Sequence, residues 1–334
     1  MIRLQDIADR VGVSRTTVSN VLHGQTKRVS KETRDKIAAI LEEENYKPNM
    51  GSLMLAKNES KLIGVVLWYE RPQGLNLLQD PFVNSVLAGM HEEVRNTDYF
   101  LMLIGGQDLQ RVINIASLWN IEGLITVGIF EENLIHLRKV LNKPIVSIDT
   151  YATQKAKVIN VGVNDYDGGY QMGRFFVQRG LNKSVYITAY NKNADYYRWL
   201  GFKKAMEEAD IYCGDNRNIL VPSDVPTRLS FYGKILDRLL ESRGMFCASD
   251  ALAIEAINYF YDQGIRVPEQ MSVAGFDDIV YATSIRPQLT SIHQDIEEKG
   301  ALALRELIRV IGEKSTESKR IKMPVRLVVR DSVI

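Results

Sequence analysis

Residues 4–24 read LQDIADRVGVSRTTVSNVLHG and contain the pattern of two short helices joined by a turn. The apolar residues of the first helix recur at spacings of three and four, which places them on one face: Leu4, Ile7, Ala8 and Val11. Gly12 then permits a turn, because glycine adopts backbone conformations that other residues avoid. Ser14 is a favourable N-cap for the second helix. The inward positions of that helix are Val18, Val21 and Leu22.

A third helix is predicted directly after this pair. Ser30 is its expected N-cap, and its inward side chains again follow helical spacing: Thr33, Ile37, Ile40 and Leu41. Pro48 disfavours helix at the residue before it, so the helical region ends there. Residues 1–48 are therefore expected to form a small three-helix unit.

The outer face of the second helix carries polar side chains that suit DNA recognition. The N-terminal end of a recognition helix reaches base edges in the major groove, where arginine pairs with guanine and asparagine with adenine. Hydroxyl groups and the first backbone N–H groups suit phosphates. The predicted DNA-contacting residues of this region are Ser14, Arg15, Thr16, Thr17, Ser19, Asn20 and His23. The periodicity alone is equally compatible with a packing unit whose polar face meets solvent.

From residue 62 the pattern changes to short apolar runs, beginning with LIGVVL at 62–67. Such runs are typical of strands buried on both faces of a parallel sheet. Others occur at 99–104, 123–127, 145–148, 158–161, 184–187, 218–221, 245–248 and 271–275. Amphipathic segments of helical length separate most of them, among them 84–95, 167–179, 199–209, 226–242 and 251–263. The alternation predicts α/β units, and about nine or ten strands suit two lobes better than one sheet.

The composition excludes several classes of protein. With 45% hydrophobic and 25% charged residues, this chain of 334 residues has the balance of a soluble globular protein with more than one domain. A net charge of +1 gives no overall attraction to nucleic acid, so any DNA contact must come from a local patch. Cys213 and Cys247 form no disulfide framework and have no metal-ligand spacing.

The sequence also lacks signals for export, membranes and catalysis. Asp6 comes early and no apolar stretch follows it, so no secretory signal is expected. No apolar run approaches the roughly 18 residues of a membrane span, and we expect a cytoplasmic protein without a membrane partner. The histidines are scattered and no nucleophile–base arrangement is evident, so neither metal, cofactor nor enzymatic activity is expected. Residues 168–173, GGYQMG, lack the lysine of a phosphate loop, and close helix packing is their predicted role.

Several motifs along the whole chain resemble those of the LacI/GalR family of transcription regulators. They are residues 4–24, 29–49 (VSKETRDKIAAILEEENYKPN), 52–66 (SLMLAKNESKLIGVV), 264–278 (GIRVPEQMSVAGFDD), 285–295 (IRPQLTSIHQD) and 325–332 (VRLVVRDS). The resemblance implies a helix-turn-helix headpiece, a hinge helix with a linker, and a sensor domain of two α/β lobes like the type I periplasmic binding proteins. The implied ranges are 1–48, 49–61 and 62–334, with one lobe near 62–161 plus 293–323 and the other near 162–292 plus 324–334.

The resemblance also implies roles in DNA binding. Arg15, Thr16 and Asn20 fall where the family reads bases, and residues 49–57 match its hinge helix, which begins at Asn49. Leu55 occupies the position of a leucine that enters the minor groove, where an apolar wedge unstacks base steps and bends the DNA. Gly51 and Ser52 lie where better helix formers are usual. Because glycine costs roughly 1 kcal/mol relative to alanine in a helix, this hinge is expected to depend more strongly on DNA.

An effector site is expected where the strands of each lobe end, since ligands of open α/β sheets bind beyond the carboxyl ends of the strands. Carboxylates, an arginine fork and flat rings suit a polyhydroxylated ligand. The predicted effector-binding residues are Phe82, Asp149, Tyr197, Arg198, Ser249, Asp250 and Asp277. Arg198 and Asp277 match the effector positions of the family best. Other roles remain open: Asp250 suits an N-cap, Asp278 a turn, and Tyr197 packing.

The predicted function is that of a sequence-specific transcription regulator, a repressor controlled by a small-molecule effector. The residues of the expected effector site favour a saccharide as that effector. It is expected to bind palindromic double-stranded operator DNA as a homodimer, because a two-fold operator mirrors a two-fold protein. The alternative is a periplasmic-type solute-binding protein without a regulatory role. That class would share the two lobes, but residues 1–60 argue against it.

Overall fold

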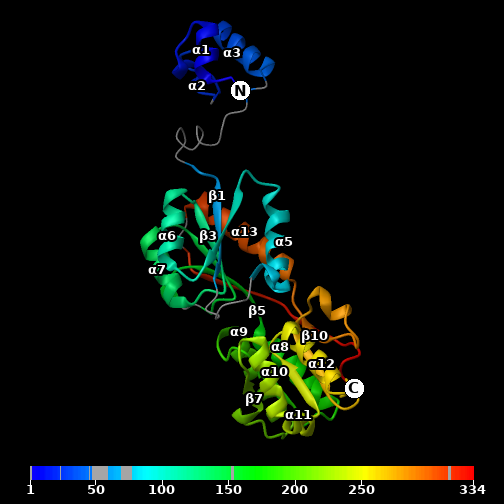
Figure 1. Cartoon of the computed structure of the whole chain (residues 1–334). Coiled ribbons are helices and arrows are strands. Elements are labelled where there is room, and N and C mark those ends of the chain that lie inside the picture. Colours follow the sequence, from blue (N-terminus) through cyan, green and yellow to red (C-terminus); the bar gives the residue numbers. More distant parts are fainter. Residues whose placement is uncertain are drawn as a thin grey trace. The chain divides into compact units, whose positions relative to one another are not determined.

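A computed structural model describes residues 2–22, 24–44, 46, 59–68, 77–151, 154–314 and 317–334. The chain divides into two compact units, Met1–Ser60 and Lys61–Ile334, which are coloured from blue to red along the sequence in Figure 1. The first unit is helical and the second contains two largely parallel sheets, so both parts of the predicted fold class are confirmed.

The first unit consists of three helices: α1 (Leu4–Val11), α2 (Arg15–Leu22) and α3 (Lys31–Glu43). Gly12 makes the turn after α1 with a φ of 74°, a left-handed conformation that glycine adopts without strain. The Ser30 side chain caps α3 by accepting a hydrogen bond from the Thr33 amide at 3.2 Å. The fully buried core residues come from all three helices: Ile7, Ala8, Val18 and Ile37.

The second unit contains two six-stranded sheets. The first has the order β11-β5-β4-β3-β1-β2 and the second β12-β10-β9-β8-β6-β7. The strands of the first sheet are β1 (Leu62–Trp68), β2 (Phe100–Gly106), β3 (Gly123–Val127), β4 (Ile145–Ile148), β5 (Ile159–Val163) and β11 (Lys319–Met323). Those of the second are β6 (Val185–Thr188), β7 (Asn218–Leu220), β8 (Gly244–Cys247), β9 (Ser272–Asp277), β10 (Thr290–His293) and β12 (Arg326–Val328). Only the pairing of β10 with β12 is antiparallel among the described strands.

Helices cover both faces of the first sheet. In Figure 1, α5 (Pro81–Val94) and α13 (Ile296–Glu313) lie on one side of β1 and β3, and α6 (Leu109–Leu118) and α7 (Glu131–Leu141) lie on the other. The second sheet is accompanied by α8 (Asp165–Gln178), α9 (Asn193–Glu207), α10 (Val225–Lys234), α11 (Leu236–Ser242) and α12 (Asp250–Asp262). Short 3-10 turns are η1 (Leu77–Gln79), η2 (Gln154–Ala156), η3 (Asp215–Arg217) and η4 (Val280–Thr283).

Glycines permit close contact between neighbouring helices. A Cβ atom at Gly169 of α8 would lie 1.9 Å from the carbonyl oxygen of Arg198 in α9, and one at Gly173 would lie 2.8 Å from the Phe202 carbonyl oxygen. The glycines of residues 168–173 therefore serve helix packing, as their sequence predicted. This packing also fixes the backbone of Arg198.

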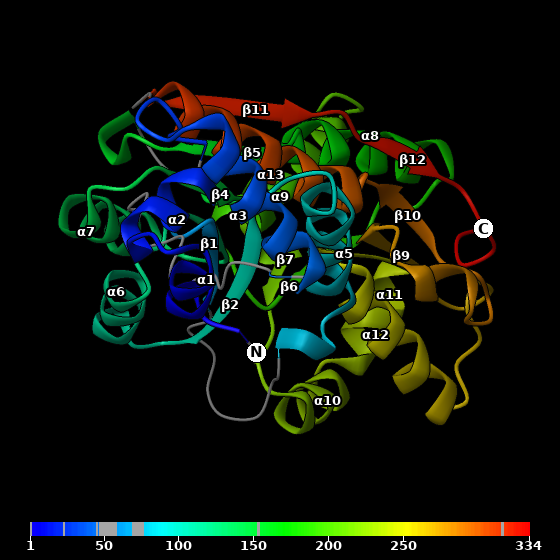
Figure 2. The same ribbon diagram turned by 90° about the horizontal axis from the view of Figure 1, so that it is seen from above.

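The chain passes between the two sheets three times, from β5 to α8, from β10 to α13 and from β11 to β12. Figure 2 shows β11 and β12 following one another along one side of this unit. Residues at these crossovers, such as Gln294, can contact groups of both sheets. Among the described residues, no helix is both long and apolar enough to cross a membrane.

The predicted strands correspond to β1 through β9, whereas β10, β11 and β12 were not predicted. β11 reads KRIKM, and its charged side chains are typical of an edge strand rather than of a buried apolar run. The prediction of a single helix over 226–242 is wrong. The segment forms α10 and α11, which meet at Ile235, where the backbone leaves the helical conformation just after Gly233.

Candidate functional site

The N-terminal end of α2 presents an exposed polar surface. The Ser14 hydroxyl caps the helix by accepting a hydrogen bond from the Thr17 amide at 3.1 Å, and it lies 2.9 Å from the Thr17 hydroxyl. Val18 is fully buried, which fixes the rotation of the helix. Arg15 and Thr16 are consequently exposed at the first turn, the position from which a recognition helix contacts bases.

The other predicted DNA-contacting residues divide into two groups. Ser19 and Asn20 belong to the second turn of α2 and are half-buried. His23, Asn49 and Leu55 lie outside the described residues. The contacts predicted for all these residues remain predictions.

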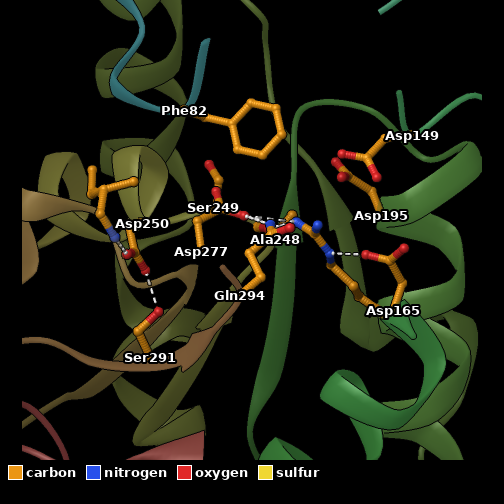
Figure 3. Close-up of polar contacts among 12 residues, drawn as sticks. Phe82, Asp149, Asp165, Asp195, Ala248, Ser249, Asp250, Asp277, Ser291 and Gln294 are labelled. Carbon is orange, nitrogen blue, oxygen red and sulfur yellow. Dashed lines mark hydrogen bonds and ion pairs between the residues drawn. The ribbon is translucent and has the colours of Figure 1, made fainter. Parts of the chain in front are cut away.

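The second unit contains a cavity of about 390 Å³. Five of the seven predicted effector-binding residues line it: Phe82, Asp149, Arg198, Ser249 and Asp277. They belong to different elements, because Phe82 begins α5, Asp149 follows β4, Arg198 lies in α9, Ser249 precedes α12 and Asp277 ends β9. Figure 3 shows Phe82, Asp149, Ser249 and Asp277 around the same space. The cavity wall thus comes from both sheets, near the carboxyl ends of their strands.

Arg198 is held firmly by the protein itself. Its side chain is buried, Nε donates to Asp165 Oδ1 at 2.8 Å, and Nη1 donates to the Ala248 carbonyl oxygen at 2.5 Å. The guanidinium lies 3.5 Å from the centre of the Phe276 ring and 3.8 Å from Asp277 Oδ1. Burial lowers the pKa of Arg198, but the carboxylates of Asp165 and Asp277 raise it by more than burial lowers it. The net effect is a raised pKa, so the guanidinium stays charged. The arginine is therefore preorganised.

Asp277 is a buried carboxylate that lies close to Arg198. Gln294 Nε2 donates to its Oδ1 at 2.6 Å. Burial raises the pKa of Asp277 to about 7, against the opposing effects of Arg198 and Gln294. Its φ of 112° lies in a region that non-glycine residues rarely adopt, and such conformations concentrate at functional sites.

The sequence did not point to Lys299, which forms an ion pair with the lining residue Asp149. Its ammonium group lies 3.0 and 2.8 Å from the two carboxylate oxygens of Asp149, donates to Gln294 Oε1, and lies 5.1 Å from the Phe82 ring centre. The Lys299 residue is fully buried. Burial raises the pKa of Asp149, and Lys299 opposes that change. The helical spacing could have identified Lys299 as a buried residue, because it follows Ile296 by three positions and so lies on the buried face of α13.

Gln294 connects this pair with the second sheet. It lies at the crossover after β10, accepts from Lys299 and donates to Asp277. A continuous polar chain therefore runs through Asp149, Lys299, Gln294, Asp277 and Arg198. The affinity of a molecule that contacts both ends of this polar chain would depend on how the two sheets are arranged.

A second ion pair in the wall was also missed. Arg228 of α10 and Glu255 of α12 meet through two parallel hydrogen bonds of 2.6 and 2.7 Å. Arg228 Nη1 additionally donates to the carbonyl oxygens of Pro222 and Ser223, both at 2.8 Å. Most donors of this arginine are used within the protein, whereas the carboxylate of Glu255 lines the cavity.

Two predicted effector residues do not line the cavity. Tyr197 is 39% exposed, and its ring stacks on Tyr151 with centres 4.6 Å apart. The Tyr151 hydroxyl in turn donates to Asp165, the partner of Arg198. The packing role of Tyr197, which the sequence left open, therefore agrees with its contacts.

Asp250 is fully buried and points away from Phe82 and Asp149 (Figure 3). It accepts hydrogen bonds from the Ile279 amide at 2.8 Å and the Ser291 hydroxyl at 2.6 Å. Burial raises the pKa of Asp250 well above its usual value. The N-cap interpretation of Asp250 is wrong, because Ser249 caps α12 by accepting from the Leu252 amide.

The cavity is richer in acceptors than in available donors. Its lining includes five carboxylates, from Asp80, Asp149, Asp195, Glu255 and Asp277. The arginines of the lining already donate to protein oxygens. A ligand that offers several hydroxyl donors would complement this wall. No group of three or more His, Cys, Asp or Glu in the described part of the chain could hold a metal ion.

Comparison with protein families assigns both units. Residues 3–49 match the family of bacterial regulatory proteins, lacI family, and residues 174–333 match the periplasmic binding protein-like domain. The HTH-type transcriptional repressor PurR of Serratia proteamaculans (strain 568) is 29% identical over 340 residues, which cover 100% of this chain and 97% of the relative. The probable HTH-type transcriptional repressor ExuR of Bacillus subtilis (strain 168) is 26% identical over 350 residues, covering 100% and 98%.

Solved structures support the same fold. The lac repressor dimer bound to operator and the anti-inducer ONPF superimposes with a TM-score of 0.80 at 21% identity, covering 100% of this chain and 99% of that one. The complex of the transcriptional regulator CelR with cellobiose has a TM-score of 0.74 at 22% identity, covering 99% and 100%. The match of residues 3–49 favours a regulator over a solute-binding protein, and the relatives are repressors rather than enzymes. The chain therefore combines a helix-turn-helix domain of the lacI family of bacterial regulatory proteins with a periplasmic binding protein-like domain.

Proposed function

We propose that this chain is a repressor that binds palindromic operator DNA as a homodimer and is controlled by a saccharide bound in the cavity between its two sheets. The observation that carries the proposal is the polar chain from Asp149 through Lys299, Gln294 and Asp277 to Arg198, which joins both sheets at the cavity wall. A ligand in the cavity could couple its binding to the relative arrangement of the two sheets.

The first unit supplies DNA recognition in this proposal. Arg15 and Thr16 are exposed at the start of α2 and are assigned to base contacts, with Asn20 one turn further. Ser14, Thr17 and the first amides of α2 are assigned to phosphates. The hinge, with Leu55 in the minor groove, completes the operator contacts. Two copies would present two such surfaces to the two half-sites of a palindrome.

The chemistry of the cavity favours a polyhydroxylated effector. Carboxylate oxygens of Asp149, Asp277 and Glu255 accept hydroxyl donors, and the Phe82 ring suits the apolar face of a sugar. Related structures contain cellobiose, ribose and D-xylulofuranose. We expect the protein to act in the cytoplasm, where it meets its operator.

Control of DNA binding requires that the ligand bind one arrangement of the sheets more tightly than another. A coupling of about 1–3 kcal/mol is typical and corresponds to roughly 5–150-fold in operator affinity. Contacts from Asp149 on one sheet and Asp277 on the other would provide this difference. The crossover residue Gln294 connects these two groups, because it donates to Asp277 and accepts from Lys299, the partner of Asp149. Its position would change with a shift of either sheet.

The test combines operator selection with ligand titration. An operator is first selected from a random palindromic DNA library, and its affinity is measured by fluorescence anisotropy with and without a panel of saccharides. Arg198→Lys and Asp277→Ala should raise the ligand concentration needed for a response by at least about tenfold, because lysine cannot reproduce the guanidinium contacts. Lys203→Met, which changes a surface lysine paired with Asp215, is the matched control.

Two results would contradict the proposal. If no saccharide alters operator affinity, the effector class is wrong. If Arg198→Lys and Asp277→Ala respond at the same ligand concentration as the unaltered protein, the cavity is not the effector site. Operator affinity measured without ligand reports whether each variant is folded.

A further inference from the structure

A second cavity, of about 270 Å³, adjoins the first. The two share five wall residues: Leu77, Asp80, Phe82, Asp149 and Asp195. Figure 3 shows that Phe82, Asp149 and Asp195 lie on the same side of the drawn site. Because these residues line both spaces, the two cavities form one continuous binding region with two subsites.

The second subsite differs from the first in its chemistry. Its wall includes Phe130, which precedes α7 on the first sheet, and Tyr190, which follows β6 on the second. Their rings stack with centres 6.2 Å apart and planes 18° from parallel. The rings meet across the two sheets and form an aromatic wall. Flat rings of this kind cover the apolar face of a sugar ring.

Trp68, another lining residue of this subsite, carries an unpartnered polar group. It ends β1, lines the second cavity and is only 5% exposed. Its Nε1 atom is buried and has no hydrogen-bond partner among the described residues. Buried indole N–H groups usually have a partner, because an unpaired buried donor is costly. Within the described ranges of the chain, this donor therefore has no acceptor oxygen.

We propose that the effector has two linked sugar rings, a disaccharide or a glycoside of similar size. One ring binds in the first subsite, near Arg198 and Asp277. The second ring binds against Phe130 and Tyr190, where the Trp68 N–H donates to one of its oxygens. This inference rests on the proposed function, because it specifies the effector of the same site.

The junction between the subsites favours a sugar over a nucleobase for the second ring. Asp80, Asp149 and Asp195 line this junction and present carboxylate oxygens, which accept hydrogen bonds. A sugar ring carries a hydroxyl donor on most of its carbons. A purine carries ring-nitrogen acceptors along its edges as well as donors, and those acceptors would be repelled where they face the carboxylates.

The test is calorimetric titration of the purified full chain with defined compounds. The probes are glucose and galactose, the disaccharides cellobiose, maltose and lactose, and the nucleosides adenosine and guanosine. At least one disaccharide should bind tenfold or more tightly than either of its component monosaccharides. Binding of none of the disaccharides would overturn the proposal, as would a nucleoside that binds more tightly than all of them.

Two variants locate the second ring. Phe130→Ala and Trp68→Phe should each weaken disaccharide binding by about three- to tenfold, through loss of ring stacking and of the indole donor respectively. The loss for the monosaccharide should be smaller than twofold. Tyr261→Ala and Trp119→Phe change aromatic residues that are 81% and 48% exposed, and serve as matched controls. Equal losses for both sugars would overturn the assignment of the second subsite.

Calorimetry and operator binding separate this inference from the proposed function. A disaccharide that binds with the expected variant pattern but leaves operator affinity unchanged would support the two subsites and contradict the regulatory role. A monosaccharide that alters operator affinity as strongly as every disaccharide would support regulation and overturn the two-ring effector.

Discussion

Replacing Lys299 with methionine should make the stability of the second unit strongly dependent on pH. Methionine keeps much of the length and apolar character of the lysine stem but removes the ammonium group. That group lies 2.8 Å from Asp149 Oδ2 and is fully buried. The substitution therefore leaves the Asp149 carboxylate and the Gln294 carbonyl oxygen without their shared donor.

The expected loss follows from the burial of the two partners. Removing one partner of a buried ion pair costs about 3–5 kcal/mol, because the remaining charge is left uncompensated. The Asp149 side chain is 18% exposed, which favours the lower end of that range. The predicted loss at pH 8 is therefore about 3 kcal/mol, or roughly 6–12 °C in Tm for a unit of this size.

The sign of the pH dependence follows from linkage. Burial already raises the pKa of Asp149, and loss of the lysine removes the main opposing charge. The folded state then binds a proton more tightly than the unfolded state, so stability falls as pH rises from about 4 towards the raised pKa. The deficit of Lys299→Met should accordingly be smaller at pH 5 than at pH 8.

Urea unfolding followed by tryptophan emission measures this effect in the full chain. The three tryptophans, Trp68, Trp119 and Trp199, all belong to the second unit, so the emission reports on that unit alone. Adding Asp149→Asn to Lys299→Met should recover much of the loss, because no buried charge remains. Lys203→Met, at a pair whose Asp215 is 88% exposed, should cost less than about 1 kcal/mol. A loss for Lys299→Met no larger than this control, or one independent of pH, would refute the reasoning.

Three further predictions concern DNA and proton binding. Arg15→Ala should weaken operator binding and relax discrimination at one base position by about 1–3 kcal/mol, measured against single-base operator variants; an equal loss on random DNA would make Arg15 a phosphate contact instead. Leu55→Ala should reduce operator affinity and DNA bending without changing calorimetric effector affinity, and unchanged bending would contradict its minor-groove role. Because burial raises the pKa of Asp277 to about 7, stability should fall as pH rises towards and through 7, and Asp277→Asn should lessen this fall. Parallel unfolding curves of the two proteins at pH 6 and pH 8 test this; the same pH dependence in both would contradict it.

The sequence by itself determined the elements whose causes are local. The three helices of the first unit follow from apolar spacing, from Gly12 and from the caps Ser14 and Ser30, which all act within a few residues of the chain. The apolar runs of β1 to β9 likewise show in the sequence, because parallel strands buried on both faces are apolar throughout. The ends of those strands then indicated five residues of the cavity wall.

Only the tertiary structure decided which charges meet. Lys299 and Asp149 are 150 positions apart, and no local pattern joins them. Tyr197 and Asp250 come from the same strand ends as the cavity residues, yet their contacts with Tyr151 and Ser291 turn them to other surroundings. A sequence pattern gives a residue's face on its own element, whereas the partner of a side chain depends on how distant elements cross.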